Sequence, residues 1–420
     1  MQKLFSTVFK TGQLAASFLD RVINDSCIGD PNYTGDPYPE YERLLSQGPI
    51  VRSYVIGGWC VLDFDTVVEL LKDPRVSADL FKNPTLHRMY RFSSDGDSRI
   101  LQNPLMLNTD PPEHSRLRKL ARSGFLHNFV QALEEKIRQS VNQCFLEVEG
   151  QTQIDLIDTL ARPLPANIIS DLIGVEAHDR EQFRFMTEAY LRGVSKIEFS
   201  SLRRADKAFG EMLEFMEIVV ERKRLDRGDD LISALIAAEE DGDKLSAEEV
   251  TTMCVLLMSA GYETTSRLIG NAVYLLLKHP EQLLELRKNP ELVPNAIEEV
   301  LRFEPPVQAL VRIALEDMEV RGRQIKKHQT LILIPAAANR DPNANDNPDK
   351  FDITRKNIKH IAFGYGIHLC LGAELARLET KVALEMLLDR YPQIELASQS
   401  PKWEPGYVMR GLEELTLRVA

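Results

Sequence analysis

The spacing of apolar residues predicts a chain that is mostly α-helical. Five segments between residues 64 and 224 carry apolar side chains at three- and four-residue intervals, the period of an amphipathic helix. They are Phe64 to Lys72, Pro111 to Ala121, Leu126 to Val148, Arg180 to Leu191 and Ser201 to Arg224. We therefore expect a large helical body.

The longest helix is predicted in the second half of the chain. Ser246, followed three residues later by Glu249, forms a capping box that satisfies backbone N–H groups at a helix start. Apolar periodicity then continues without proline to Lys278, where His279-Pro280 ends it. Two further helices are predicted, from Leu292 to Arg302 and from just after Cys370 to Leu388.

β-structure is predicted in short pieces near both ends of the chain. Ile50 to Val55 and Trp59 to Leu62, joined through two glycines, indicate a hairpin. The later pieces are Val307 to Ile313, Met318 to Val320, Thr330 to Ile334 and Leu415 to Val419. Because these strands and the helices interleave, we expect one domain over residues 1–420, with residues 1–25 loosely attached.

Composition and charge exclude several classes of protein. A formal net charge of -12 argues against a nucleic-acid-binding protein with a general basic field. The amino-terminal segment is broken by Lys10, Gln13 and Asp20, so it is no membrane span. We expect residues 4–19 to form a terminal helix lying on the body, with a weak membrane contact as the less favoured alternative. A monomer in the cytoplasm is the default expectation.

The five cysteines are odd in number and widely spread, which fits neither a disulfide framework nor a zinc site. Cys60, Cys144 and Cys254 have apolar neighbours and are most simply small core residues. Cys370 differs, because it stands between a glycine-rich loop and a predicted helix. The N–H groups at the start of that helix would stabilise a thiolate. A buried cysteine in a glycine turn and a haem ligand both remain open on this local chemistry.

The segment around Cys370 resembles the haem-binding signature of the cytochromes P450, Phe-Gly-x-Gly-x-His-x-Cys-x-Gly. It matches at every defined position: Phe363, Gly364, Gly366, His368, Cys370 and Gly372. The resemblance implies a mainly α cytochrome P450 fold that holds haem b between the long central helix and the helix after the cysteine. It also implies thiolate ligation by Cys370, with Phe363 near the sulfur and His368 near a haem propionate.

A polar stretch, Ala260-Gly261-Tyr262-Glu263-Thr264-Thr265, interrupts the long apolar helix. Gly261 would leave room for a ligand, and the Thr264 hydroxyl can bond the Ala260 carbonyl one turn earlier. The stretch resembles the family's oxygen-activation motif, which implies that Glu263 and Thr264 deliver protons. That pair favours an O2-driven monooxygenase over two alternatives, a peroxide-driven peroxygenase and a haem-thiolate protein that only binds or senses.

Glu299 and Arg302 stand at helical three-residue spacing and resemble the family's structural Glu-x-x-Arg pair. The third partner of that pair is usually an arginine in a Pro-x-x-Phe segment. Here Pro348-Asp349-Lys350-Phe351 has lysine at that place, with Arg355 close behind. Either Lys350 or Arg355 is therefore expected to complete the network, and Arg355 is the favoured residue.

Further cations are candidates for the two haem propionates. His114 and Arg118 lie four residues apart on one predicted helix, so both point the same way. The resemblance implies that this pair, with Arg312 and His368, binds propionate. It also implies an apolar substrate lining, drawn from Leu101 to Leu107, Val255 to Ser259, Val307 to Leu310 and Gly406 to Met409.

Electrons must come from elsewhere, because the chain has no glycine-rich nucleotide fingerprint and no additional cysteine cluster. We expect a separate ferredoxin- or flavodoxin-type donor with its reductase. Six basic residues near the cysteine segment could dock an acidic donor, although solvated surface charge is nearly as good an explanation. They are Arg116, Lys119, Arg122, Lys359, Arg377 and Lys381.

Overall fold

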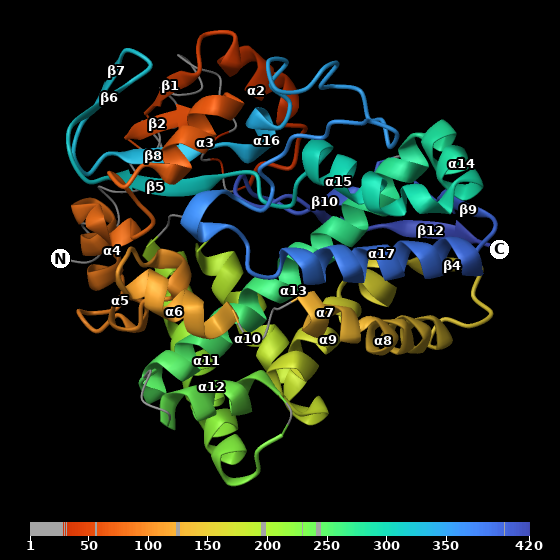
Figure 1. Ribbon diagram of the computed structural model, residues 1–420, viewed down its shortest axis with the longest axis horizontal. Coiled ribbons are helices and arrows are strands. Elements are labelled where there is room, and N and C mark those ends of the chain that lie inside the picture. Colours follow the sequence, from red (N-terminus) through yellow and green to blue (C-terminus); the bar gives the residue numbers. More distant parts are fainter. Residues whose placement is uncertain are drawn as a thin grey trace.

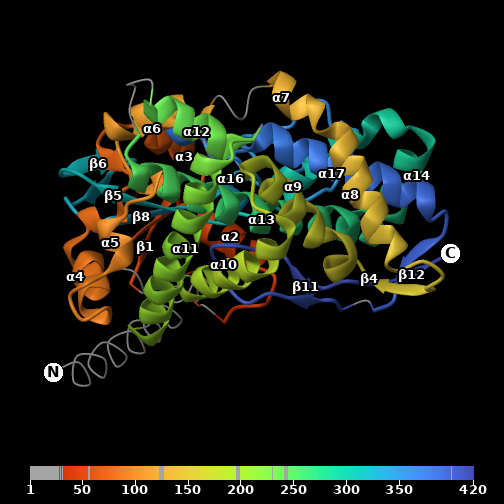
Figure 2. The ribbon, with the colours of Figure 1, turned by 90° about the horizontal axis from the view of Figure 1, so that it is seen from below.

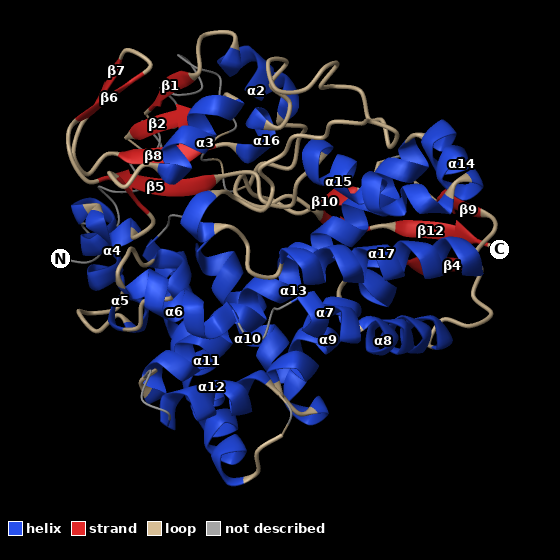
Figure 3. Cartoon of the chain, in the orientation of Figure 1, coloured by secondary structure: helices blue, strands red, loops and turns tan. Residues whose placement is uncertain are grey.

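The computed structural model describes residues 28–420 except positions 29, 31, 55–56, 123–126, 195–198, 229, 241–244 and 399. The expected helix over residues 4–19, the loose segment 1–25 and Cys27 lie outside this part of the chain. Figures 1 and 3 show a helical body with small sheets, which confirms the predicted mainly α class. None of the described helices is both long and apolar enough to cross a membrane.

The helices largely follow the apolar periodicity of the sequence. Their bounds are α2 Tyr38–Leu45, α3 Phe64–Lys72, α4 Pro84–Ser93, α5 Arg99–Gln102, α6 Glu113–Ala121, α7 His127–Ala132, α8 Glu134–Leu146, α9 Pro163–Ile173, α10 Arg180–Val194, α11 Phe199–Leu225, α12 Leu231–Glu240, α13 Ala247–Lys278, α14 Pro280–Lys288, α15 Val293–Phe303, α16 Pro335–Ala338 and α17 Ala373–Arg390. The predicted bounds of α3 are confirmed end for end.

The prediction of one helix from Leu126 to Val148 is wrong. The structure has two helices there, α7 and α8, with Leu133 between them. The Leu133 N–H bonds the Val130 carbonyl three residues back, at 3.0 Å, and so tightens the backbone to a 3₁₀ turn. Apolar spacing continues through such a turn, which is why periodicity alone did not reveal the break.

A five-stranded sheet collects segments that are far apart in the sequence. Its order is β1-β2-β8-β5-β3, with bounds Ile50–Ser53, Gly58–Val61, Thr330–Leu333, Leu310–Ala314 and Val76–Ser77. The predicted hairpin is confirmed, since β1 pairs antiparallel with β2 and Ile50 lies opposite Val61. Val307, predicted at the start of β5, instead forms an isolated bridge with Met409.

Three smaller sheets complete the β portion of the residues that the structure describes. They are β4 Gln153–Asp155 with β12 Thr416–Val419 and β9 Ile394–Leu396, β10 Lys402–Trp403 with β11 Leu412–Glu414, and β6 Met318–Val320 with β7 Arg323–Ile325. The five-stranded sheet lies toward one end of the molecule and α8 toward the other, with α17 beside α8 and reaching back to the middle (Figures 1 and 2).

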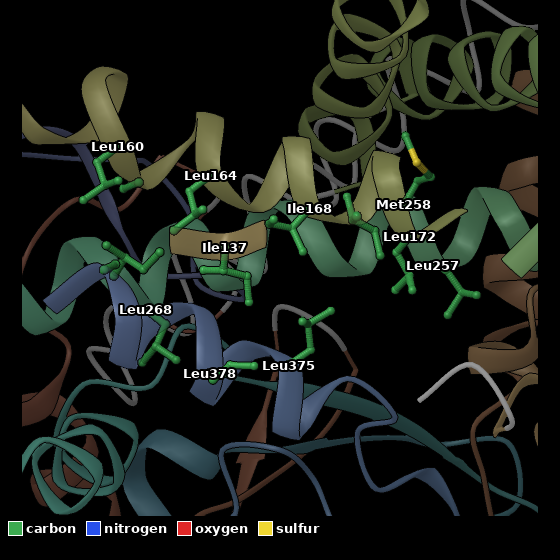
Figure 4. Packing of buried hydrophobic residues seen from close by; sticks show 14 of the residues in the cluster. Ile137, Leu160, Leu164, Ile168, Leu172, Leu257, Met258, Leu268, Leu375 and Leu378 are labelled. Carbon is green, nitrogen blue, oxygen red and sulfur yellow. The ribbon is translucent and has the colours of Figure 1, made fainter. Parts of the chain in front are cut away.

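Helix α13 is the centre of the core. The predicted capping box begins it, with Ser246 Oγ accepting from the Glu249 N–H at 3.2 Å and the Glu249 carboxylate accepting from the Ser246 N–H at 2.9 Å. Figure 4 shows Leu164 and Ile168 of α9 on one side of α13, and Leu375 and Leu378 of α17 on the other. The buried faces of these helices belong to one large apolar cluster.

Truncation of this packing should destabilise the protein strongly. Leu164 on α9 is 0% exposed, so Leu164→Ala is expected to lower the free energy of unfolding by about 2–5 kcal/mol through lost burial and the cavity left behind. The matched control is Ile218→Ala, because Ile218 is 58% exposed and its removal should change stability by less than ~0.5 kcal/mol. Urea unfolding of both variants measures the difference. Equal losses would contradict the central position of α9.

Candidate functional site

A cavity of about 1720 Å³ lies in the middle of the protein, beside α13 and the loop before α17. All four segments predicted to line a substrate site contribute to its wall. Their lining residues are Leu105, Met106 and Leu107, then Leu256, Leu257 and Ser259, then Val307, Ala309 and Leu310, and finally Tyr407, Val408 and Met409. The wall is therefore mainly apolar, as expected from these sequences.

The Cys370 thiol lines this cavity, whereas Cys60, Cys144 and Cys254 are buried in the core as predicted. Gly364 and Gly366 before it adopt φ values of +73° and +70°, which favour glycine. A Cβ at Gly366 would lie 2.7 Å from the Leu71 carbonyl oxygen, so the loop passes close to α3. The Cys370 N–H then donates to the Phe363 carbonyl at 2.9 Å.

Opposing influences act on the pKa of the Cys370 thiol. Burial raises the pKa of the Cys370 thiol, while a hydrogen bond from the Gly372 backbone and the charges of Arg118 and Arg377 lower it. The Gly372 donor stands just before α17, at the helix start where the sequence predicted N–H groups facing the sulfur. The loop thus offers a single thiol whose ionised form has a donor and two cations nearby.

Four cationic or titratable side chains gather on the wall beside Cys370. His114, Arg118, Arg312 and His368 all line the cavity, as the sequence predicted. The His114 and His368 rings lie 4.0 Å apart between centroids. Both ring nitrogens of His114 and Nε2 of His368 are buried and have no hydrogen-bond partner among the described residues.

The surroundings of these groups favour their uncharged forms. Burial, with the charge of Arg118, lowers the pKa of His114, and burial with His114 and Arg312 lowers the pKa of His368 to about 3. Burial also lowers the pKa of Arg312 to about 10. Buried cations and orphaned nitrogens of this kind call for an anionic partner. A haem fits, because its two propionates would meet these groups while Cys370 meets the iron.

The polar stretch of α13 faces the same cavity. Ala260, Gly261, Glu263 and Thr264 line it, and the Thr264 hydroxyl donates to the Ala260 carbonyl at 2.8 Å, as predicted. That Gly261 leaves room for a ligand stays a prediction, and the structure adds a second role for this glycine. A Cβ at Gly261 would lie 3.1 Å from the side chain of Ile169, so this glycine also lets α9 pack closely against α13.

The Glu299–Arg302 pair is fully buried and has a definite third member. Arg302 Nε donates to Glu299 Oε2 at 2.7 Å, with both side chains 0% exposed. Arg355 Nε lies 3.2 Å from Glu299 Oε2, whereas the Lys350 ammonium contacts Asp352 at 3.1 Å. Arg355 is therefore the third partner, and Lys350 contributes only its backbone carbonyl, which accepts from Arg302 and Arg355.

Comparison with known proteins decides the family. A profile of the cytochrome P450 family matches residues 75–409. A Bacillus subtilis (strain 168) cytochrome P450 is 38% identical over 94% of this chain and 97% of its own length. The 6-deoxyerythronolide B hydroxylase of Saccharopolyspora erythraea is 35% identical over 91% of this chain and 96% of its own. The chain belongs to the cytochrome P450 family.

A solved structure supports the assignment. A myxobacterial cytochrome P450 in complex with myristic acid superposes with a TM-score of 0.85 at 34% identity, covering 92% of this chain and 96% of the other. This cytochrome P450 is accordingly a haem-thiolate monooxygenase that takes a small-molecule substrate, O2 and electrons from a redox partner.

Several polar residues of the site were not anticipated. Arg267 forms an ion pair with Glu263, and the i,i+4 spacing on a helix could have revealed it. Glu379 lines the cavity, and burial raises its pKa to about 8. Tyr90 and Tyr190 also line it, and both pack against the apolar core. Nothing in the spacing of these three residues indicates a shared cavity.

The basic cluster near the cysteine is less free than the sequence suggested. Arg116 forms an ion pair with Glu249, and Arg377 with Glu298 at 2.6 Å. Lys381 lies 3.6 Å from Glu385 and 3.9 Å from Glu134. At least three of the six predicted docking cations are therefore neutralised within the chain.

Two substitutions should show that Glu299 belongs to the buried network and that the Lys350 side chain does not. Glu299→Gln leaves the Arg302 charge buried without its partner, and should lower the free energy of unfolding by about 3–5 kcal/mol. Lys350→Ala should change it by less than ~0.5 kcal/mol, because the Lys350 side chain is 65% exposed and its carbonyl is retained. Urea unfolding at neutral pH measures both. A comparable loss in the two variants would show that the lysine side chain belongs to the network.

Proposed function

We propose that this chain inserts one atom of O2 into an apolar small molecule, with Cys370 as the thiolate ligand of the haem and with Glu263 and Thr264 delivering protons. The observation that carries the proposal is that Cys370 and Thr264, from two different elements, line one cavity. When bound, the haem supplies reductive activation of O2, which a thiolate ligand favours by adding electron density.

The haem would be held by the residues of the cavity wall. Arg118 and Arg312, with the neutral imidazoles of His114 and His368, would bind the propionates. Phe363, whose carbonyl already bonds the Cys370 N–H, would cover the sulfur side. Ala260 and Gly261, which line the same cavity, would also contact the haem.

Monooxygenation consumes two protons and two electrons for each O2, and the second oxygen atom leaves as water. The protons must cross an apolar wall, so side chains have to carry them. Thr264 Oγ1 donates its own proton to the Ala260 carbonyl, which leaves its oxygen free to accept from the cavity side. Glu263, one residue earlier, is the carboxyl group that would resupply this hydroxyl.

The substrate class follows from the cavity lining. Similar solved structures hold myristic acid and testosterone, both apolar molecules with polar groups at an end. Here the wall is mainly apolar, and Tyr90 and Tyr190 bring two phenol groups to its lining. Burial, with the nearby Tyr190 phenol, raises the pKa of Tyr90, so both phenols stay protonated. A fatty acid, terpenoid, steroid or polyketide-like molecule with such an end would suit this wall.

A separate ferredoxin- or flavodoxin-type protein with its reductase would supply the electrons, since the sequence has no nucleotide-binding fingerprint. Lys359 and Arg122 near the cysteine loop would contribute to its docking surface. The single domain over residues 1–420, the monomeric state, the cytoplasmic location and the absence of a nucleic-acid partner stay predictions.

The ligand assignment is tested by the absorption spectrum of the reduced, carbon monoxide-bound protein. We expect the red-shifted Soret band typical of a thiolate ligand in the unsubstituted protein, and its loss in Cys370→Ser. Cys144→Ala is the matched control, because Cys144 is buried away from the cavity, and it should keep the band. Retention of the band in Cys370→Ser would rule out Cys370 as the ligand.

The proton-delivery assignment is tested by Thr264→Ala. The electrons from NADPH should then reduce O2 to hydrogen peroxide, and the product formed per NADPH should fall about tenfold or more. The carbon monoxide spectrum should be retained. Thr251→Ala is the control, because its hydroxyl makes the same helical bond, to Ala247 at 3.1 Å, without lining the cavity. Coupling is measured with a compound that shifts the Soret band. Unchanged coupling in Thr264→Ala would favour the peroxide-driven alternative.

A further inference from the structure

The Glu263 carboxylate does not lie free beside Thr264. Its Oε1 forms an ion pair with Arg267, one helical turn further along α13. Its Oε2 is buried and has no hydrogen-bond partner among the described residues. Residues four apart share a helix face, so the Arg267 guanidinium lies directly beside the carboxylate. It thereby holds the carboxylate of a residue that, like Thr264, lines the cavity.

A second carboxylate holds Arg267 in turn. Arg267 Nη2 lies 2.5 Å from Glu404 Oε2, and the arginine side chain is only 9% exposed. Gly411 makes the approach possible, because a Cβ at this position would lie 2.4 Å from Arg267 Cγ. The Glu404 N–H donates to the Gly411 carbonyl at 3.0 Å, so the hairpin of β10 and β11 fixes both residues against the arginine.

The ionic contacts continue to the protein surface. Glu404 Oε1 lies 3.4 Å from Arg162, and Arg162 lies 2.5 Å from Asp158, whose side chain is 70% exposed. On the α10 side, the Tyr262 hydroxyl bonds Glu188 at 3.3 Å, and Glu188 pairs with Arg184. Among these groups, Arg267 is the cation in direct contact with Glu263. The same β10–β11 hairpin carries Tyr407, Val408 and Met409 on the cavity wall.

We propose that Arg267 is a positioning residue that fixes the place and the proton affinity of the Glu263 carboxylate. Glu404 holds the Arg267 side chain, and the absence of a side chain at Gly411 leaves space for it. The inference rests on the proposed function, in which Glu263 supplies protons. Arg267 itself carries no proton to the site, because a guanidinium does not deprotonate in proteins. Its removal would leave two carboxylates facing one another, and like charges take up protons at higher pH.

The test measures protonation of Glu263 directly, without turnover. Infrared difference spectra of the holoenzyme are recorded against pH, and the protonated-carboxyl band of Glu263 is identified as the one that Glu263→Gln removes. In Arg267→Met this band should appear at a pH about one to three units higher than in the unsubstituted protein. Lys207→Met is the control, since Lys207 pairs with Glu211 on α11 and is 78% exposed, and it should leave the midpoint unchanged.

Gly411→Ala tests the same contact with every charge retained. The added methyl group would displace the Arg267 side chain. The pH midpoint of the Glu263 band should therefore also rise in this variant, but by less than in Arg267→Met. Arg267→Lys should restore part of the shift, because the charge remains while the two-sided contact is lost. These two variants also keep the proposal testable if Arg267→Met does not fold.

The pH profile of peroxide released per NADPH gives a second readout and should move in the same direction as the infrared midpoint. A midpoint in the folded Arg267 and Gly411 variants equal to that of the unsubstituted protein would overturn the proposal, as would the absence of any band that Glu263→Gln removes. The carbon monoxide spectrum should stay unchanged throughout. A lost thiolate band in the unsubstituted protein would instead overturn the proposed function, so the two failures are distinguishable.

Discussion

A cavity of about 1720 Å³ can persist inside a packed core only if the elements around it are held apart by their own contacts. In this protein α13 packs on α9 along one side and on α17 along another, as Figure 4 shows. Gly261 brings α9 close, and the buried Glu299–Arg302–Arg355 network ties α15 to the loop at residues 346–355. These fixed contacts leave the Cys370 loop facing the polar stretch of α13.

The same constraint explains where charge is placed. A flat cofactor with two carboxylates can be buried only if the wall already carries donors for them. Arg118, Arg312 and the two histidines provide these, drawn from α6, β5 and the cysteine loop. Burial and the neighbouring cations lower the pKa values of His114 and His368, and a carboxylate beside the two rings would act in the opposite direction.

Much of this could be predicted from the sequence, because it depends on local spacing. Helical geometry predicts three features: the bounds of α13, the bond from Thr264 to Ala260, and the position of His114 and Arg118 on one cavity. What the spacing could not decide depends on contacts between distant segments. The contact of Ile169 with Gly261, the choice of Arg355 over Lys350 at Glu299, and the pairing of Glu404 with Arg267 are set by how helices and hairpins pack. The break between α7 and α8 was missed because a 3₁₀ turn keeps the apolar period.

Helix α13 must serve both as the apolar centre of the core and as the polar wall of a reaction site. A buried polar group is costly unless it is paired. The helix meets this requirement mostly within itself: Ser259 bonds Val255, Thr264 bonds Ala260, and Glu263 pairs with Arg267. Other polar groups of the helix have partners outside it. The Asn271 amide donates to the Glu304 and Arg410 carbonyls, and Arg267, which brings a full charge into the core, pairs with Glu404. A charge at this depth therefore requires the β10–β11 hairpin beside it, which explains why Glu404 and Gly411 stand opposite one another.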